Sequence, residues 1–190
     1  MTTQHSTLNP AIRECAEAIA VIASGIRDDQ LQNRTPCEKF TVAELVGHFT
    51  EVLRSSVRAA RKEGEPGADA AAGVSPRELA GSAQLVAAAW SDPAAYEGTT
   101  EFVVGEMPAA FAASLTLQEM ALHAWDLARA TGRPFAPGEE TGRLTLGVVE
   151  QVAEQARSNG VFGPAVPVGD DEPAFRRALG RSGRNPGWNG

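Results

Sequence analysis

The stretch AAFAASLTLQEMALHAWDLARATGRP, residues 109–134, decides the fold class. It predicts a helix over 109–131, because Gly132 takes the usual place of a residue that ends a helix and Pro134 cannot continue one. Within this helix Glu119 and His123 are spaced i, i+4, and Asp126 follows at i+7. Three side chains that can bind a metal therefore share one helix face.

Amphipathic helices are predicted on both sides of this stretch. Two capping boxes, Thr41 with Glu44 and Ser75 with Glu78, mark the start of two of them, and Pro10 suits the first turn of the first helix. Apolar residues recur close to every 3.6 residues in each segment. The predicted helices span residues 10–29, 41–62, 75–90, 109–131 and 139–159. Few segments favour strands, so the fold class is all-α, a helical bundle.

The segments between these helices are long for a simple bundle. Residues 30–40 form a connector in which Pro36 breaks helical geometry. Residues 63–75 are small and polar and are expected to be a mobile linker, and residues 91–107 a structured loop or small hairpin. The Gly- and Pro-rich residues 160–190 are expected to wrap as an irregular tail with one short helical piece near 173–179. These long connections allow a helix order other than up-and-down.

Composition excludes several classes of protein. The 190 residues fit a single domain, 1–190. A net charge of −7 disfavours nucleic acid as a partner, and no apolar stretch is long enough to span a membrane. The N-terminal residues lack a secretory pattern, and the two cysteines, Cys15 and Cys37, form no disulfide framework. A reduced cytoplasmic protein is expected.

The scarce histidines point to a metal hypothesis. Among three histidines, His48 and His123 both lie within predicted helices. Glu119 and His123 could chelate a metal from one helix, and His48 on a second helix could complete a three-ligand site with an open position. Asp126 could instead accept a hydrogen bond from a metal-binding histidine and so fix the tautomer of that ring. It could also serve as an alternative ligand. A structural interpretation also stays open, because helix spacing alone does not bring His48 to the others.

Several motifs resemble one family across most of the chain. Residues 35–42 with His48, TPCEKFTV…H, are similar to a TPC…WTV…L…H element of actinobacterial relatives of the mycothiol-dependent maleylpyruvate isomerase N-terminal domain, which belong to the DinB-like superfamily. Residues 119–132, EMALHAWDLARATG, resemble the same family's E…HxWDLAxATG element. Residues 162–164 and 180–188 resemble its tail. Phe40 stands where tryptophan is usual.

The resemblance implies a DinB-like four-helix bundle that holds a divalent metal, usually zinc. Carried over by position, the metal ligands are His48, Glu119 and His123. The resemblance also implies a low-molecular-weight thiol such as mycothiol as cosubstrate, a small-molecule electrophile, and a transferase or isomerase-like activity. The isomerase has an extra C-terminal domain for which 190 residues leave no room, so isomerisation of maleylpyruvate itself is not expected. The alternative is a non-catalytic metal- or small-molecule-binding protein of the same fold, and a homodimer stays open.

Other reactive side chains receive structural interpretations. Cys37 follows Pro36 in a connector with no evident base, so a structural role is preferred over a nucleophile. Cys15 lies on an apolar stripe and is expected in the core. Trp125, two residues after His123, points away from the chelating face and is expected to pack.

Overall fold

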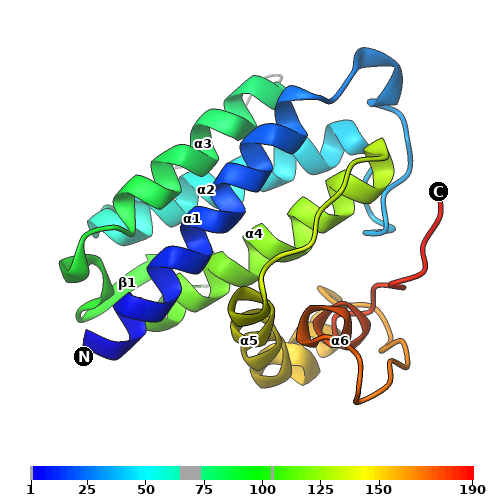
Figure 1. The fold of residues 1–190 in the computed structure, drawn as a ribbon. Helices are drawn as coiled ribbons and strands as arrows, with labels where there is room; N and C mark the ends of the chain where they lie inside the picture. Colours follow the sequence, from blue (N-terminus) through cyan, green and yellow to red (C-terminus); the bar gives the residue numbers. More distant parts are fainter. Residues whose placement is uncertain (1, 65–73, 104) are drawn as a thin grey trace.

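The computed structural model describes residues 2–64, 74–103 and 105–190, and within them the chain is an all-α bundle with one small hairpin (Figure 1). The bundle consists of α1 (Thr2–Ser24), α2 (Val42–Arg61), α3 (Pro76–Ala89) and α4 (Ala109–Thr131). The predicted fold class is confirmed. None of the described helices has the length and apolar character needed to cross a membrane.

The order of the helices is not up-and-down. The main contacts join α1 with α3 and α4, and α2 with α3 and α4. Helices α1 and α2, and likewise α3 and α4, therefore lie diagonally opposite each other although they follow one another in the chain. The connectors 25–41 and 90–108 have to cross the ends of the bundle, which explains their length. They contain two short 3₁₀ helices, η1 (Asp28–Gln30) and η2 (Pro93–Tyr96).

The first helix differs from its prediction at both ends. It begins at Thr2, so Pro10 lies inside it rather than in its first turn, and it ends at Ser24 rather than at residue 29. A proline inside a helix removes one backbone donor, but Leu8 is buried beside it and the Asn9 side chain donates to the Trp90 carbonyl at 3.1 Å. These contacts favour continuing the helix through Pro10.

Capping chemistry places α2 and α3 where the sequence predicts them. The Thr41 hydroxyl accepts from the Glu44 amide, and the Glu44 carboxylate accepts from the Thr41 amide at 2.8 Å. Ser75 and Glu78 repeat this arrangement, with the Ser75 amide 2.9 Å from the Glu78 carboxylate. Most of the expected linker before α3, residues 65–73, lies outside the described residues.

The segment before α4, expected to be a structured loop or a small hairpin, forms a hairpin. Strand β1 (Thr99–Phe102) pairs antiparallel with β2 (Gly105–Pro108), with Thr99 opposite Pro108. The Thr100 hydroxyl donates to the Ala59 carbonyl at 2.7 Å, and Phe102 is 2% exposed. One face of the hairpin thus packs on the bundle.

Helix α4 is the centre of the molecule. It spans the predicted range and ends at Gly132, whose φ of 69° is a left-handed conformation that glycine adopts without strain. Most of its side chains are buried, and they pack with those of α1 and α2 in one hydrophobic core. A polar group on α4 therefore needs a partner inside the protein.

Two further helices lie beside the bundle (Figure 1). Helix α5 (Glu139–Ser158) packs on α4, and α6 (Ala174–Arg181) packs on α5. The approach of α6 is close, because a Cβ added to Gly142 would lie 3.1 Å from the Phe175 backbone nitrogen. Both helices were expected near these positions, and the chain after α6 returns toward α4.

Candidate metal centre

The site is built on the buried face of α4. His123 is 6% exposed and Asp126 is completely buried. The Glu119 carboxylate lies 3.2 Å from His123 Nε2, and the Asp126 carboxylate lies 3.0 Å from His123 Nδ1. The i, i+4 and i, i+3 spacings of an α-helix explain both contacts. Each ring nitrogen of His123 therefore faces a carboxylate of its own helix.

His48 reaches this face from α2 and is held by the connector before it. The Thr35 hydroxyl lies 2.9 Å from the Cys37 carbonyl and 2.8 Å from the Phe40 carbonyl, which folds the TPC segment into a compact turn. Phe40 then stacks on His48, with ring centroids 4.8 Å apart and an angle of 19°. The His48 and His123 rings are 5.3 Å apart and perpendicular.

The three side chains predicted as ligands come together. One potential ligand atom from each of His48, Glu119 and His123 lies within 4.8 Å of the others. We name these three residues the His48 group. In a tetrahedral zinc site, ligands about 2.0–2.1 Å from the ion are about 3.3 Å from one another. The 3.2 Å between Glu119 Oε2 and His123 Nε2 matches that spacing.

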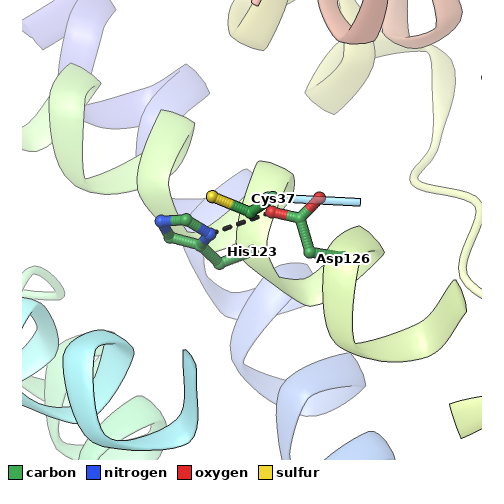
Figure 2. Close-up of side chains that lie close together, drawn as sticks. All are labelled: Cys37, His123 and Asp126. Atoms are coloured by element: carbon green, nitrogen blue, oxygen red, sulfur yellow. Dashed lines mark hydrogen bonds and ion pairs between the residues drawn. The ribbon is translucent and has the colours of Figure 1, made fainter. Parts of the chain in front are cut away.

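A second group shares His123 and was missed by the sequence analysis. Figure 2 shows Cys37 beside His123 and Asp126, and one potential ligand atom from each lies within 4.8 Å of the others. We name these residues the Cys37 group. The preferred structural interpretation of Cys37 rested on the absence of an evident base, whereas the structure places an imidazole near the thiol. The spacing of these residues in the sequence does not predict this contact, because the connector that holds Cys37 and helix α4 are far apart in the chain and come together only in the folded protein.

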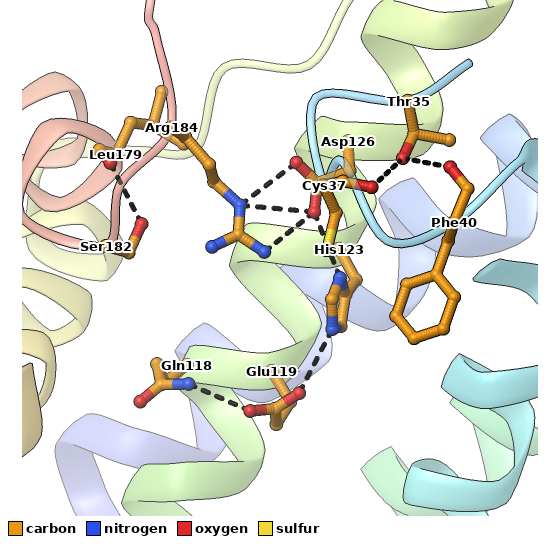
Figure 3. A network of polar contacts seen from close by, with 10 residues as sticks. All are labelled: Thr35, Cys37, Phe40, Gln118, Glu119, His123, Asp126, Leu179, Ser182 and Arg184. Carbon is orange, nitrogen blue, oxygen red and sulfur yellow. Dashed lines mark hydrogen bonds and ion pairs between the residues drawn. The ribbon is translucent and has the colours of Figure 1, made fainter. Parts of the chain in front are cut away.

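Arg184, from the tail after α6, was also missed. Its Nε lies 3.0 and 3.1 Å from the two oxygens of Asp126, and its Nη2 lies 2.8 Å from Oδ2 (Figure 3). Arg184 is 7% exposed and Asp126 fully buried, so this is a buried ion pair with several hydrogen bonds. The negative charge in the Cys37 group is already compensated by the chain itself.

Glu119 has weaker partners. Its other carboxylate oxygen accepts from the Gln118 amide at 2.9 Å (Figure 3). Within the part of the chain that the structure describes, its only ion pair is with His123. The Gln118 carbonyl oxygen is buried and finds no hydrogen-bond partner among those residues. Among the described residues, the carboxylate of the His48 group thus has no ion pair with a lysine or arginine, unlike that of the Cys37 group.

These contacts shift the pKa values in a consistent pattern. Burial opposes the charged form of His123, but Asp126 and Glu119 together raise the pKa of its ring. Burial and the neighbouring His123 lower the pKa of His48. Burial alone would raise the pKa of both carboxyls, but His123 lowers the pKa of Glu119, and Arg184 with His123 lowers that of Asp126. Burial raises the pKa of the Cys37 thiol.

The remaining predicted side chains have structural surroundings. Cys15 and Trp125 are both buried in the core, as expected. Burial also raises the pKa of the Cys15 thiol, which leaves it in the unreactive neutral form. Neither residue belongs to the His48 group.

Comparisons with known proteins show what the chain is similar to. A family model described as the mycothiol maleylpyruvate isomerase N-terminal domain matches residues 12–128. An uncharacterised protein of Mycobacterium tuberculosis strain H37Rv is 29% identical over 171 residues, which cover 87% of this chain and 88% of that protein. Its counterpart in strain CDC 1551 matches with the same values. No solved structure matches the chain.

Proposed function

The chain belongs to the mycothiol maleylpyruvate isomerase N-terminal domain family, and we propose that it holds a divalent cation, Zn²⁺ in the first instance, with His48, Glu119 and His123. The observation that carries the proposal is the convergence of two imidazoles and one carboxylate within 4.8 Å. Three such ligands leave one coordination position open, as in catalytic zinc sites. The family is linked to mycothiol, and we propose that a low-molecular-weight thiol is the cosubstrate.

The donor atoms suit this cation. Imidazole nitrogen and carboxylate oxygen are common zinc ligands, and the charge of Glu119 lacks a lysine or arginine partner among the described residues. The Cys37 group is the poorer choice, because a cation there would lie next to the Arg184 guanidinium, which already pairs with Asp126. The two groups share His123, so the electrostatic difference selects between them.

Each residue has a separate task in the proposed reaction. When bound, the cation would hold a thiol sulfur as thiolate, which would attack an electrophilic carbon in a transfer or an isomerisation. His48 is kept in place by its stack on Phe40, and His123 by Asp126. Glu119 is oriented by Gln118. The chain thereby keeps its ligands in position before the cation arrives.

Metal content tests the site. The purified protein is loaded with Zn²⁺, dialysed, and compared with His123→Ala and with His5→Ala, which removes the third histidine of the sequence. We expect about one equivalent of zinc in the unaltered protein and in His5→Ala. The His123→Ala variant should bind more than about 100-fold more weakly, since even residues behind the ligands change affinity 10–100-fold. Equal zinc in all three proteins would refute the site.

A thiol assay tests the chemistry. The zinc-loaded protein is incubated with mycothiol and a panel of electrophiles, including epoxides, activated alkenes and maleylpyruvate, and products are identified by mass spectrometry. Conjugate or isomer formation that disappears with a chelator and in His123→Ala supports a thiol-dependent enzyme. Zinc binding without any detectable product supports a second candidate function, which is metal binding without catalysis.

That second candidate is a metal-binding protein of the same fold without catalysis. One observation favours it: the matching family model describes the N-terminal domain of an isomerase and covers residues 12–128. The chemistry of such a domain can depend on other parts of an enzyme. The thiol assay separates the two candidates, because both expect the same zinc content.

A further inference from the structure

We propose that Arg184 is a positioning residue of the metal centre, which holds the Asp126 carboxylate against His123 so that Nε2 of the ring faces His48 and Glu119. This inference rests on the proposed function. It also extends the site beyond the segment that the family model matches, since Arg184 lies after residue 128.

The contacts leave Asp126 no freedom to turn. Its two oxygens lie within 3.1 Å of Arg184 Nε, and Oδ2 is also 2.8 Å from Arg184 Nη2. The same Oδ2 lies 3.0 Å from His123 Nδ1. Because the arginine and the carboxylate are both buried, water cannot replace either partner without opening the structure. A guanidinium fork that binds two oxygens fixes the carboxylate plane as well as its position.

The two carboxylates around His123 therefore differ in mobility. Asp126 is fixed by a second charged residue, whereas Glu119 is held on its other oxygen by the neutral amide of Gln118. A neutral imidazole carries one hydrogen, and a hydrogen bond from one ring nitrogen to a carboxylate leaves the other nitrogen free to bind a metal. The fixed acceptor is Asp126, so the hydrogen stays on Nδ1 and the lone pair of Nε2 points toward the His48 group.

The backbone of the tail positions Arg184 next to α4. Gly183 has a φ of 84°, and a Cβ added there would lie 2.8 Å from the backbone of Gly163. A Cβ on Gly180 would lie 2.5 Å from the Val166 carbonyl oxygen. The Arg184 amide then donates to the Leu179 carbonyl at 2.9 Å, which turns the chain sharply after α6. Both close approaches seat the tail against residues 163–166, and Arg184 extends from it toward α4.

A second arginine provides a matched control. Arg129 lies on α4, as Asp126 does, and donates from Nη2 to the Trp188 carbonyl and, at 3.2 Å, to the Asn189 side chain. It ties the same tail to the same helix but does not take part in the described contacts of Asp126. Arg129→Gln therefore loosens the tail without changing the surroundings of His123, whereas Arg184→Gln changes both.

The first measurement needs no metal. Protein labelled with ¹⁵N in histidine is studied by long-range ¹H–¹⁵N correlation in alkaline solution, where the ring is neutral. We expect the Nδ1–H tautomer of His123 in the unaltered protein and in Arg129→Gln. Arg184→Gln should show a mixture of both tautomers. A wild-type His123 spectrum in a folded Arg184→Gln protein would overturn the proposal, whatever the outcome of the zinc experiments.

The second measurement uses Zn²⁺ itself, with affinity determined by competition against a chromophoric chelator. Arg184→Gln should bind about 10–100-fold more weakly, and Arg184→Lys should lie between it and the unaltered protein because an ammonium cannot form the two-pronged contact. Arg129→Gln should stay within about twofold. Equal affinity in Arg184→Gln and the unaltered protein would overturn the positioning role. Absence of zinc binding in the unaltered protein would instead refute the proposed function, and the tautomer experiment would still decide the role of Arg184.

A double variant covers the case in which Arg184→Gln does not fold. Asp126→Asn combined with Arg184→Gln replaces the buried ion pair by two neutral amides and leaves no uncompensated charge. We expect the double variant to fold, to bind Zn²⁺ at least about tenfold more weakly, and to show both His123 tautomers. Retention of wild-type affinity and a single tautomer would show that the ion pair does not position the ring.

Discussion

The two nitrogens of His123 face regions with the same kinds of side chain but different charge balance. On the Nδ1 side, Asp126 pairs with Arg184, and the pair is buried. On the Nε2 side, Glu119 is oriented by a neutral amide and partly exposed, with 22% of its side chain accessible. One side thus contains its own cation, whereas the other offers ligands to a cation from solution. The presence or absence of a paired arginine, more than the types of ligand atom, therefore distinguishes the structural side of His123 from the side that can bind a cation.

The largest effect expected from this comparison is on stability. Asp126→Ala leaves the buried Arg184 guanidinium without its partner, which should lower the free energy of unfolding by about 3–5 kcal/mol. Glu119→Ala, the matched change on the other side, should cost less than about 1 kcal/mol in the metal-free protein, because that carboxylate is partly exposed and weakly held. Urea unfolding of both variants measures the difference. An equal loss of unfolding free energy in the two variants would mean that the Nδ1 and Nε2 sides of His123 do not differ in charge balance.

The next effect concerns pH. Zinc binding requires the lone pair of His123 Nε2, and the neighbouring carboxylates raise the pKa of this ring even though burial opposes the charge. A raised pKa means that protons compete more strongly, so zinc affinity should fall about tenfold per pH unit below that pKa and level off above it. The lowered pKa of His48 means that this ring is already neutral near pH 7. Below the raised pKa of His123, binding should therefore release one proton, from this ring.

Calorimetry in two buffers of different ionisation enthalpy, combined with competition titrations between pH 8 and 6, checks this proton count. An affinity that does not change across this range would show that His123 is not the ligand that exchanges a proton for zinc. The release of two protons at pH 7 would contradict the assignment of His48 as neutral.

A smaller effect is expected from the ring that covers His48. Phe40→Ala removes the stacked partner 4.8 Å away, and aromatic pairs contribute about 0.5–1.5 kcal/mol. Zinc affinity should fall about threefold to tenfold, while Phe40→Trp should preserve it. Phe135, which packs edge-on against Phe175 at 5.7 Å, is not part of either metal-binding group and provides the control Phe135→Ala. Equal affinity in Phe40→Ala and Phe135→Ala would show that the stack does not position His48.

The smallest effect expected is from Cys37. If the cation binds the His48 group, Cys37→Ser should change zinc affinity by less than about twofold, because the hydroxyl fits the same space near His123. If the cation binds the Cys37 group, loss of the thiolate should weaken zinc more than about 100-fold. Competition titrations on the folded variant distinguish the two, and a large loss of affinity would mean that the cation binds on the Nδ1 side of His123.

The sequence predicted the parts of the molecule that depend on local signals. The capping boxes at Thr41 and Ser75 and the terminal Gly132 gave helix boundaries within one residue or two. Helix spacing placed Glu119, His123 and Asp126 on one face, where the structure has them. Pro10 does not mark a helix start, because its local penalty inside α1 is outweighed by the burial of Leu8, which only the fold reveals.

The contacts between distant segments could not be predicted in this way. Cys37 reaches His123 because the first connector crosses the end of the bundle, and Arg184 reaches Asp126 because the tail returns to α4. Neither contact has a fixed spacing in the chain. The buried Asp126 on α4 was the available clue, since a carboxylate on a buried helix face requires a cationic partner from elsewhere.

The diagonal arrangement of α1 and α2 has a consequence for how the molecule is assembled. Because α1 packs mainly on α3 and α4, the first helix made by the ribosome has to wait for the last of the four before it gains its principal neighbours. Contacts between such distant segments slow folding relative to bundles built from successive hairpins. Arg184 emerges later still, so a nascent chain would complete its bundle first and complete the surroundings of His123 last.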